Sequence, residues 1–125
     1  MHLNNSMNNW GGKMSNQNIA IIGLGKAGTA FLGAILNKKQ NVNLVCIVEP
    51  NDTTGKAQAM EAGIKNCTID EIAKMGKDLD IIFDLSGNPS VTKELRHKLN
   101  SAFNAHTVVA PDNITRLVWA LIANT

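Results

Sequence analysis

The sequence lacks any apolar run that approaches the roughly 20 residues needed to span a bilayer. It also lacks the pattern of a signal peptide, because its first residues are rich in asparagine rather than basic and then apolar. Its formal net charge is only +2 and its lysines are scattered, so no charge excess indicates nucleic-acid binding. We therefore expect a cytoplasmic protein that binds neither membranes nor nucleic acid.

Cysteine and histidine are scarce as well, with two cysteines and three histidines in the sequence. Cys46 and Cys67 follow no recognisable pattern, which indicates free thiols in a reducing compartment. A disulfide stays open, because the two residues lie in or near predicted strands that could be neighbours. The histidines show no metal-ligand spacing with the cysteines, so no metal site is expected.

Basic residues gather at one place, where Lys93, Arg96, His97 and Lys98 follow each other closely. Glu94 lies among them, and its side chain can pair with Lys98 four residues further on. We interpret this cluster as a solvated helix face.

A chain of 125 residues with 44% hydrophobic residues is long enough for one domain with its own core. Residues 1–16 are polar, rich in asparagine and without periodicity, which predicts a disordered leader or an expression remnant. Residues 17–125 are predicted to form the single domain.

Within that domain, short apolar runs alternate with helical patterns. Strands are predicted near residues 19–22, 42–49, 64–67, 80–86 and 106–111. Helices are predicted near 26–39, 56–62, from 68 onward, 88–102 and from 112 onward. The alternation implies an α/β fold with a doubly wound parallel sheet, strand order 3-2-1-4-5 and helices on both faces.

Local signals mark several helix ends. Thr68 and Glu71 have the spacing of a capping box, and Asn88 precedes a proline that suits the first helical position. Gly63 is placed to end a helix in a left-handed conformation. In the last helix, we expect a core-facing stripe and read Trp119 as a boundary residue; the stripe comprises Ile114, Leu117, Val118, Leu121 and Ile122.

The first strand leads into a glycine turn in which Gly23, Gly25 and Gly28 have the G-x-G-x-x-G spacing. Gly23 permits the tight turn, Gly25 lets a diphosphate approach the backbone, and Gly28 allows the helix to pack closely on its strand. The N-terminus of the following helix would then face the phosphates. This pattern predicts a dinucleotide site, with a mere glycine turn as the alternative.

An acidic residue, Glu49, ends the second strand about 20 residues after the last glycine, where such motifs place a carboxylate that binds the adenine ribose. No arginine follows it, and Lys56 is the nearest cation. We therefore expect NAD, either NAD⁺ or NADH, in preference to NADP.

The switch point of the predicted sheet brings the end of the fourth strand to the same cleft. Ser86 and Asn88 could bond a ribose or pyrophosphate there, or they could only cap the local turn. Asp84 is the one acidic residue within the apolar part of that strand. We expect it to bond neighbouring backbone rather than to take part in chemistry.

The segments IAIIGLGKAG, VCIVEPN, DIIFDLSGNPSV and TVVAP resemble the N-terminal cofactor domain of the Gfo/Idh/MocA oxidoreductases. Homoserine dehydrogenase and dihydrodipicolinate reductase have similar domains. The resemblance implies a cofactor site formed by Gly23, Leu24, Gly25, Lys26, Ala27, Gly28, Glu49, Pro50, Ser86, Gly87 and Asn88.

Two departures from that family shape the functional hypothesis. Its enzymes usually carry Glu-Lys-Pro after the fifth strand, whereas this chain has Ala110 before Pro111. The chain also ends one helix later, without the family's substrate domain. We expect an NAD(H)-binding regulatory or sensory module without catalytic residues of its own, acting as a homodimer or beside a signalling domain.

The alternative from the enzyme class is the cofactor half of an NAD-dependent oxidoreductase, with its substrate domain on another part of the protein or another chain. A different nucleotide, such as the ADP part of coenzyme A, or a domain that serves only as a dimer scaffold also stays open. An intact glycine set together with Glu49 argues against the last of these.

Overall fold

The structure is a computed structural model that describes residues 17–37 and 42–123. The predicted leader at residues 1–16 lies outside the described residues. Within the described part, no helix combines the length and apolar character needed to cross a membrane.

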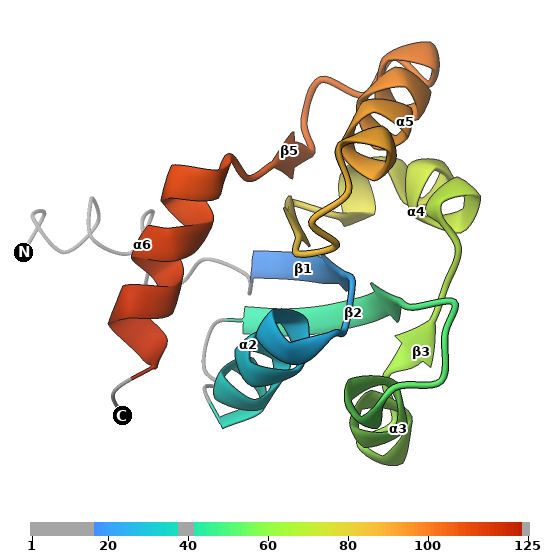
Figure 1. Ribbon diagram of the computed structural model, residues 1–125. Coiled ribbons are helices and arrows are strands. Elements are labelled where there is room, and N and C mark those ends of the chain that lie inside the picture. The colour runs from blue at the N-terminus through green and yellow to red at the C-terminus, as the bar shows by residue number, and fades with distance from the viewer. Residues whose placement is uncertain (1–16, 38–41, 124–125) are drawn as a thin grey trace, which may run out of the picture.

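A five-stranded parallel sheet forms the centre of the domain (Figure 1). Its strands are β1 (Gln17–Ile22), β2 (Val42–Val48), β3 (Lys65–Asn66), β4 (Ile81–Asp84) and β5 (Val108–Val109). They lie in the order β3-β2-β1-β4-β5, which confirms the predicted topology. The last three strands are shorter than predicted, and each edge strand pairs through two residues only.

Helices cover both faces of this sheet, as expected for a doubly wound fold. One face carries α2 (Lys26–Asn37), α3 (Thr54–Glu61) and α6 (Asp112–Ile122). The other carries α4 (Ile69–Met75), which continues into the short 3-10 helix η2 (Gly76–Asp78), and α5 (Pro89–Ser101). The observed elements thus bury a separate apolar cluster on each face of the sheet.

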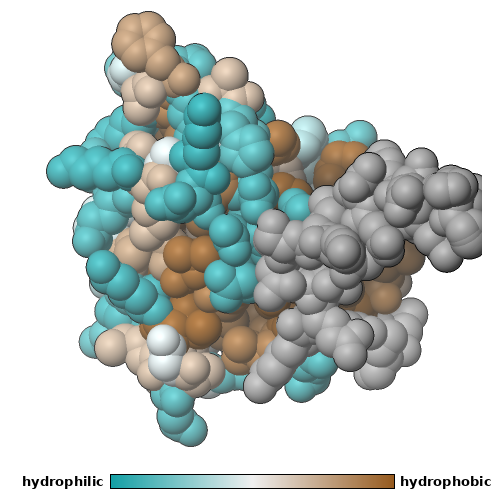
Figure 2. All heavy atoms as spheres, turned by 180° about the vertical axis from the view of Figure 1, so that it is seen from behind, coloured by the Kyte–Doolittle hydropathy of each residue, from teal (hydrophilic) through white to brown (hydrophobic). Residues whose placement is uncertain are grey.

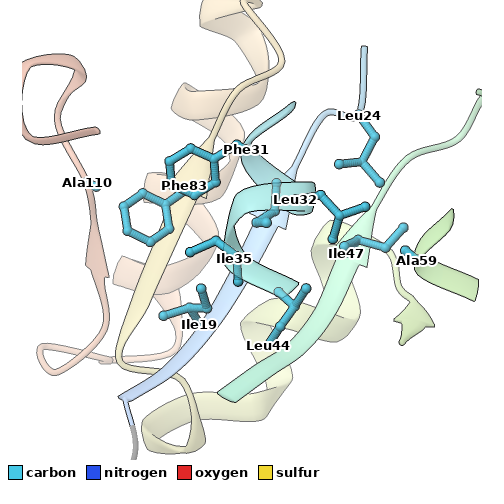
Figure 3. Packing of buried hydrophobic residues seen from close by; sticks show 11 residues of the cluster. Ile19, Leu24, Phe31, Leu32, Ile35, Leu44, Ile47, Ala59, Phe83 and Ala110 are labelled. Atoms are coloured by element: carbon cyan, nitrogen blue, oxygen red, sulfur yellow. The ribbon is translucent and has the colours of Figure 1, made fainter. Parts of the chain in front are cut away.

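The alternation of β1 divides its side chains between these clusters. Ile19 and Ile21 face α2, whereas Ala20 and Ile22 face α4 and α5. The pairing of β1 with β2 shifts between Ile19 and Ala20, so that Val45 is an extra residue on β2. Because of this bulge, Leu44 and Ile47 of β2 reach the same cluster despite their odd spacing (Figure 3).

The local helix signals are confirmed. Thr68 and Glu71 make both bonds of the capping box, and Asn88 accepts a bond of 3.0 Å from the Ser90 N–H. Gly63 has a φ of 82°, in the left-handed region. Helix α3 begins two residues before the predicted start, because the hydroxyl of Thr53 caps it.

The packed face of α6 differs from the predicted stripe. Ile114, Leu117 and Leu121 are 45%, 54% and 68% exposed. Only Val118 and Ile122 of the predicted set pack on the core, and the Trp119 ring stacks on Phe31 with the ring centroids 6.3 Å apart. The helix has apolar residues on two neighbouring faces, and the contact with Phe31 determines which one docks.

Exposed apolar side chains are not confined to α6. Val108 of the edge strand β5 is 52% exposed and Met60 of α3 is 57% exposed. Figure 2 shows apolar side chains at the surface among polar ones on the face turned away in Figure 1. Single exposed apolar residues are normal, whereas Ile114, Leu117 and Leu121 of α6 form one contiguous helical stripe, beside which Trp119 is 38% exposed.

The docking of α6 can be tested by paired truncations. We expect Trp119→Ala to lower the free energy of unfolding by about 2 kcal/mol, because it removes the stacked contact with Phe31. Leu117→Ala is expected to change it by no more than about 0.5 kcal/mol, since that side chain is mostly in solvent. Urea unfolding of both variants measures the difference, and equal effects would contradict the observed orientation.

An acidic side chain links neighbouring strands near their amino-terminal ends. Asp80 accepts bonds from the Asn18 backbone N–H at 2.8 Å and from His106 Nε2 at 2.7 Å. The bond from the Asn18 backbone, with that from His106, lowers the pKa of the Asp80 carboxyl below its ordinary value of 3.8. Asp80 therefore links β1 to the segment that leads into β5.

This link makes a prediction about acid stability. Since the pKa of Asp80 is lower in the folded state, its contribution is present above pH 3.8 and is lost as the pH falls through the folded pKa. We expect Asp80→Asn to lower the free energy of unfolding by about 1 kcal/mol at pH 7 and by less at pH 3. Thermal unfolding across this range measures it, with Asp78→Asn, an exposed carboxylate nearby, as the control.

Candidate functional site

The three motif glycines have different surroundings. A Cβ on Gly23 would lie 2.6 Å from the Ser86 backbone, and the φ of Gly23 is +89°. A Cβ on Gly28 would lie 1.8 Å from the carbonyl oxygen of Gly23, whereas one on Gly25 would meet nothing within 4 Å. Packing therefore requires glycine at 23 and 28, while Gly25 leaves its backbone open to the outside.

The carboxylate of Glu49 is almost completely buried, with 6% of the residue exposed. Its Oε1 accepts a bond of 2.6 Å from the Leu24 N–H, and Oε2 accepts one of 3.0 Å from the Asn51 N–H. Glu49 thus holds the glycine loop against the end of β2, a role that the sequence did not indicate. Each oxygen keeps a second lone pair, so the carboxylate can still accept bonds from a ligand.

Asn66 at the end of β3 fixes the backbone of Glu49 from the other side. Its Oδ1 accepts a bond of 3.0 Å from the Glu49 N–H, and its Nδ2 donates one of 3.2 Å to the Glu49 carbonyl. The sequence analysis missed this residue, because only the pairing of β2 with β3 brings it near Glu49.

The polar residues after β4 form a network of their own. Asp84 accepts bonds from the Ser86 backbone at 3.0 Å, from the Ser86 hydroxyl at 2.7 Å and from the hydroxyl of Thr92. The Ser86 hydroxyl in turn accepts a bond of 3.2 Å from the Asn88 N–H. Asp84 is therefore satisfied by local donors, and Ser86 takes part in the turn as well as facing the cleft.

A central cavity of about 420 Å³ brings most of these groups together. Six predicted site residues line it: Gly23, Gly25, Glu49, Pro50, Ser86 and Asn88. The other five lie around it. Leu24 and Gly28 are buried behind the loop, and Lys26 and Ala27 are exposed at the start of α2. Gly87 lines a neighbouring cavity.

Apolar side chains that the sequence analysis did not single out complete the walls. Ile69 at the start of α4 and Val91 in the first turn of α5 line the central cavity together with Leu85. Their positions follow from the capped starts of two helices that meet at the same edge of the sheet. A sequence signal existed only in the two N-caps, which set where each helix begins.

Two further cavities adjoin the central one. A cavity of about 330 Å³ shares Val48, Glu49, Pro50 and Ile69 with it and extends toward Asn66 and Cys67. A larger cavity of about 620 Å³ shares Asn88 and lies between α5 and the segment that leads from β5 into α6. The three form a series along the carboxyl ends of the strands, where doubly wound folds bind ligands.

The cysteines lie beside this series, and Cys67 lines its smallest cavity. Cys46 on β2 and Cys67 directly after β3 are both buried free thiols, and burial together with the proximity of Cys67 raises the pKa of Cys46 to about 12. Among the described residues, no group of three or more histidine, cysteine, aspartate or glutamate side chains is arranged to hold a metal ion.

Comparison with known proteins agrees with this arrangement. The family model named GFO_IDH_MocA, described as an oxidoreductase family with an NAD-binding Rossmann fold, matches residues 17–109. No curated protein matches the chain.

Solved structures with the same fold include the following three. GenD2 from gentamicin A biosynthesis, in complex with NAD, has a TM-score of 0.57 and 17% identity, over 88% of this chain and 32% of its own. Apo scyllo-inositol dehydrogenase from Lactobacillus casei has 0.56 and 20%, over 88% and 35%. RSP in complex with β-NADH has 0.57 and 15%, over 96% and 66%. The chain thus spans about a third of the first two proteins.

The surroundings of the motif glycines predict that a change to alanine lowers the free energy of unfolding strongly at one position and only slightly at another. Gly28→Ala is expected to lower the free energy of unfolding by at least about 2 kcal/mol, because its methyl group would overlap the Gly23 carbonyl. Gly25→Ala is expected to change it by less than about 1 kcal/mol, since the added methyl group meets open space. Chemical unfolding compares the two, and a severe loss in Gly25→Ala would contradict the geometry.

Proposed function

Since the chain belongs to the Gfo/Idh/MocA oxidoreductase family with its NAD-binding Rossmann fold, we propose that NAD(H) binds in the central cavity and in the adjoining cavity that extends toward Asn66 and Cys67. One observation carries the proposal: the open backbone at Gly25 and the carboxylate of Glu49 line the same cavity. In dinucleotide sites of this fold, the glycine backbone lets the pyrophosphate approach, and the carboxylate binds the adenine ribose next to it.

Each part of the dinucleotide has a matching part of the site. The backbone of the glycine loop and the first turn of α2 would hold the pyrophosphate, with Lys26 at the rim. Glu49 would accept bonds from the ribose hydroxyls, and the cavity beyond Pro50 would take the adenine. The turn Ser86–Gly87–Asn88 would flank the nicotinamide half. NAD(H), when bound, supplies hydride-transfer chemistry.

The charges around Glu49 favour NAD over NADP. A 2′-phosphate would approach a buried carboxylate that already holds two backbone bonds and cannot turn away. The nearest cation, Lys56, forms an ion pair of 3.6 Å with Asp52. A phosphate at this position therefore meets repulsion without a ready compensating charge.

We propose a regulatory or sensory role for the domain formed by residues 17–125, with a homodimer or a neighbouring signalling domain as its partner. Ala110, at the position where the resemblance implies a catalytic lysine, supplies no group that could transfer a proton. Binding of the cofactor would act by stabilising one arrangement of the domain. The second candidate is the cofactor half of an NAD-dependent oxidoreductase, which the match to only a third of two longer proteins favours.

Calorimetric titration of the full chain with NAD⁺, NADH, NADP⁺ and NADPH tests the site. We expect saturable binding of NAD⁺ or NADH and at least tenfold weaker binding of the phosphorylated forms, because of the charge at Glu49. Gly25→Ala is expected to weaken NADH binding at least tenfold without loss of stability, since its methyl group would stand where the pyrophosphate approaches.

A matched control is available in the same helix region. Gly33→Ala adds the same methyl group on α2 at a position with only the Gln58 side chain at 3.9 Å, outside the three cavities. It should leave NADH affinity unchanged. Absence of binding by all four nucleotides, or equal binding by Gly25→Ala and Gly33→Ala, would overturn the proposal.

A further inference from the structure

The largest of the three cavities contains groups that the proposed dinucleotide does not need. It lies beyond Asn88, and its volume is about 620 Å³. One wall is a single face of α5, formed by Pro89, Thr92, Lys93 and Arg96 at helical spacing. Residues 109–112 form the opposite wall, and Asp84 lies between the two walls.

The structure divides the basic cluster of α5 into two groups with different surroundings. Lys98 is held by Glu94 at 3.1 Å and by Asp70 of α4, which confirms the expected pair with Glu94. Lys93 and Arg96 take no part in this ion-pair group and line the cavity. Neither has an ion-pair partner among residues 17–37 and 42–123. Lys93, Arg96 and His97 are exposed, as expected of a solvated helix face, and the first two also line the cavity.

Hydrogen bonds to Thr92 and Asn88 fix the orientation of α5 and of its basic face. The Thr92 hydroxyl donates to Asp84 on β4, and Asn88 caps the start of α5, so the helix cannot turn its cations away without breaking these bonds. Asp84 accepts its three hydrogen bonds from Ser86 and Thr92, and it forms no ion pair with Lys93 or Arg96. Asp112, the other carboxylate of the cavity, forms no ion pair with either cation.

We propose that this cavity is a second binding subsite, which takes an oxyanion, the carboxylate or phosphate group of a small polar ligand. The guanidinium of Arg96 offers a planar pair of donors for such a group, and the Lys93 ammonium adds a charge one helical turn away. The inference rests on the proposed function in one respect: the shared residue Asn88 places the oxyanion beside the nicotinamide half of the cofactor. The domain would then respond to the cofactor and to the oxyanion together.

Chemical-shift titration of the ¹⁵N-labelled full chain tests the subsite, with and without saturating NADH. The probes are malonate and inorganic phosphate at constant ionic strength, so that the two possible sources of the oxyanion are compared directly. We expect saturable shifts at amides of residues 87–96 and 108–112 with at least one probe. In the double variant Lys93→Gln/Arg96→Gln, affinity for that probe should fall at least tenfold.

The control variant Lys77→Gln/Arg116→Gln removes the same two charges from exposed positions outside the cavity. It should keep wild-type affinity for the probe. Non-saturable shifts with both probes, or equal losses in the two double variants, would overturn the subsite. NADH titration of the wild-type chain separates this from the proposed function: NADH binding without saturable oxyanion binding rejects the subsite alone, whereas saturable oxyanion binding without any NADH binding rejects the cofactor proposal alone.

Discussion

The buried carboxylate of Glu49 is the interaction on which the rest of the site depends. A charge with so little exposure is stable only when donors surround it, and the Leu24 and Asn51 N–H groups supply two short bonds. These bonds join the glycine loop, the end of β2 and the turn before α3 into one unit. Asn66 then fixes the Glu49 backbone to β3. The position of the loop is therefore set before any ligand arrives.

That preorganisation explains why the glycines differ in their tolerance. Gly28 lets α2 approach until its backbone touches the Gly23 carbonyl, and Gly23 lets the turn after β4 approach from the other side. Both contacts move backbone into the space that a side chain would otherwise occupy. Gly55 serves the same purpose between α2 and α3, since its Cβ would lie 2.2 Å from the Thr29 hydroxyl. Of the three motif glycines, Gly25 alone faces open space, so it is the one whose absence of a side chain concerns a ligand.

The parts of this structure that the sequence could predict are those with a local cause. Strand order follows from the βα alternation, and the caps at Thr68 and Asn88 follow from bonds within three residues. Asn66 and the Asp80–His106 bond could not be predicted, because their partners are 17 and 26 residues away and meet only in the folded sheet. The packed face of α6 was predicted wrongly for a related reason. Its apolar residues cover two adjacent faces, and a distant ring, Phe31, decides between them.

The elements at the two ends of the series of cavities are held in place by different sets of contacts. This difference affects how the binding of a ligand could be transmitted through the domain. Around Glu49, backbone and side-chain bonds fix the loops of three strands. At the other end, β5 pairs through two residues, and α6 packs through Val118, Trp119 and Ile122 together with the buried Thr115. Local opening follows the segments with the least buried surface, so α6 requires less free energy to move than the glycine loop does. Because the cavity beyond Asn88 ends at the start of α6, a ligand bound there as proposed would contact the less firmly held element, whereas the proposed selection of NAD over NADP would depend on the bonds around Glu49.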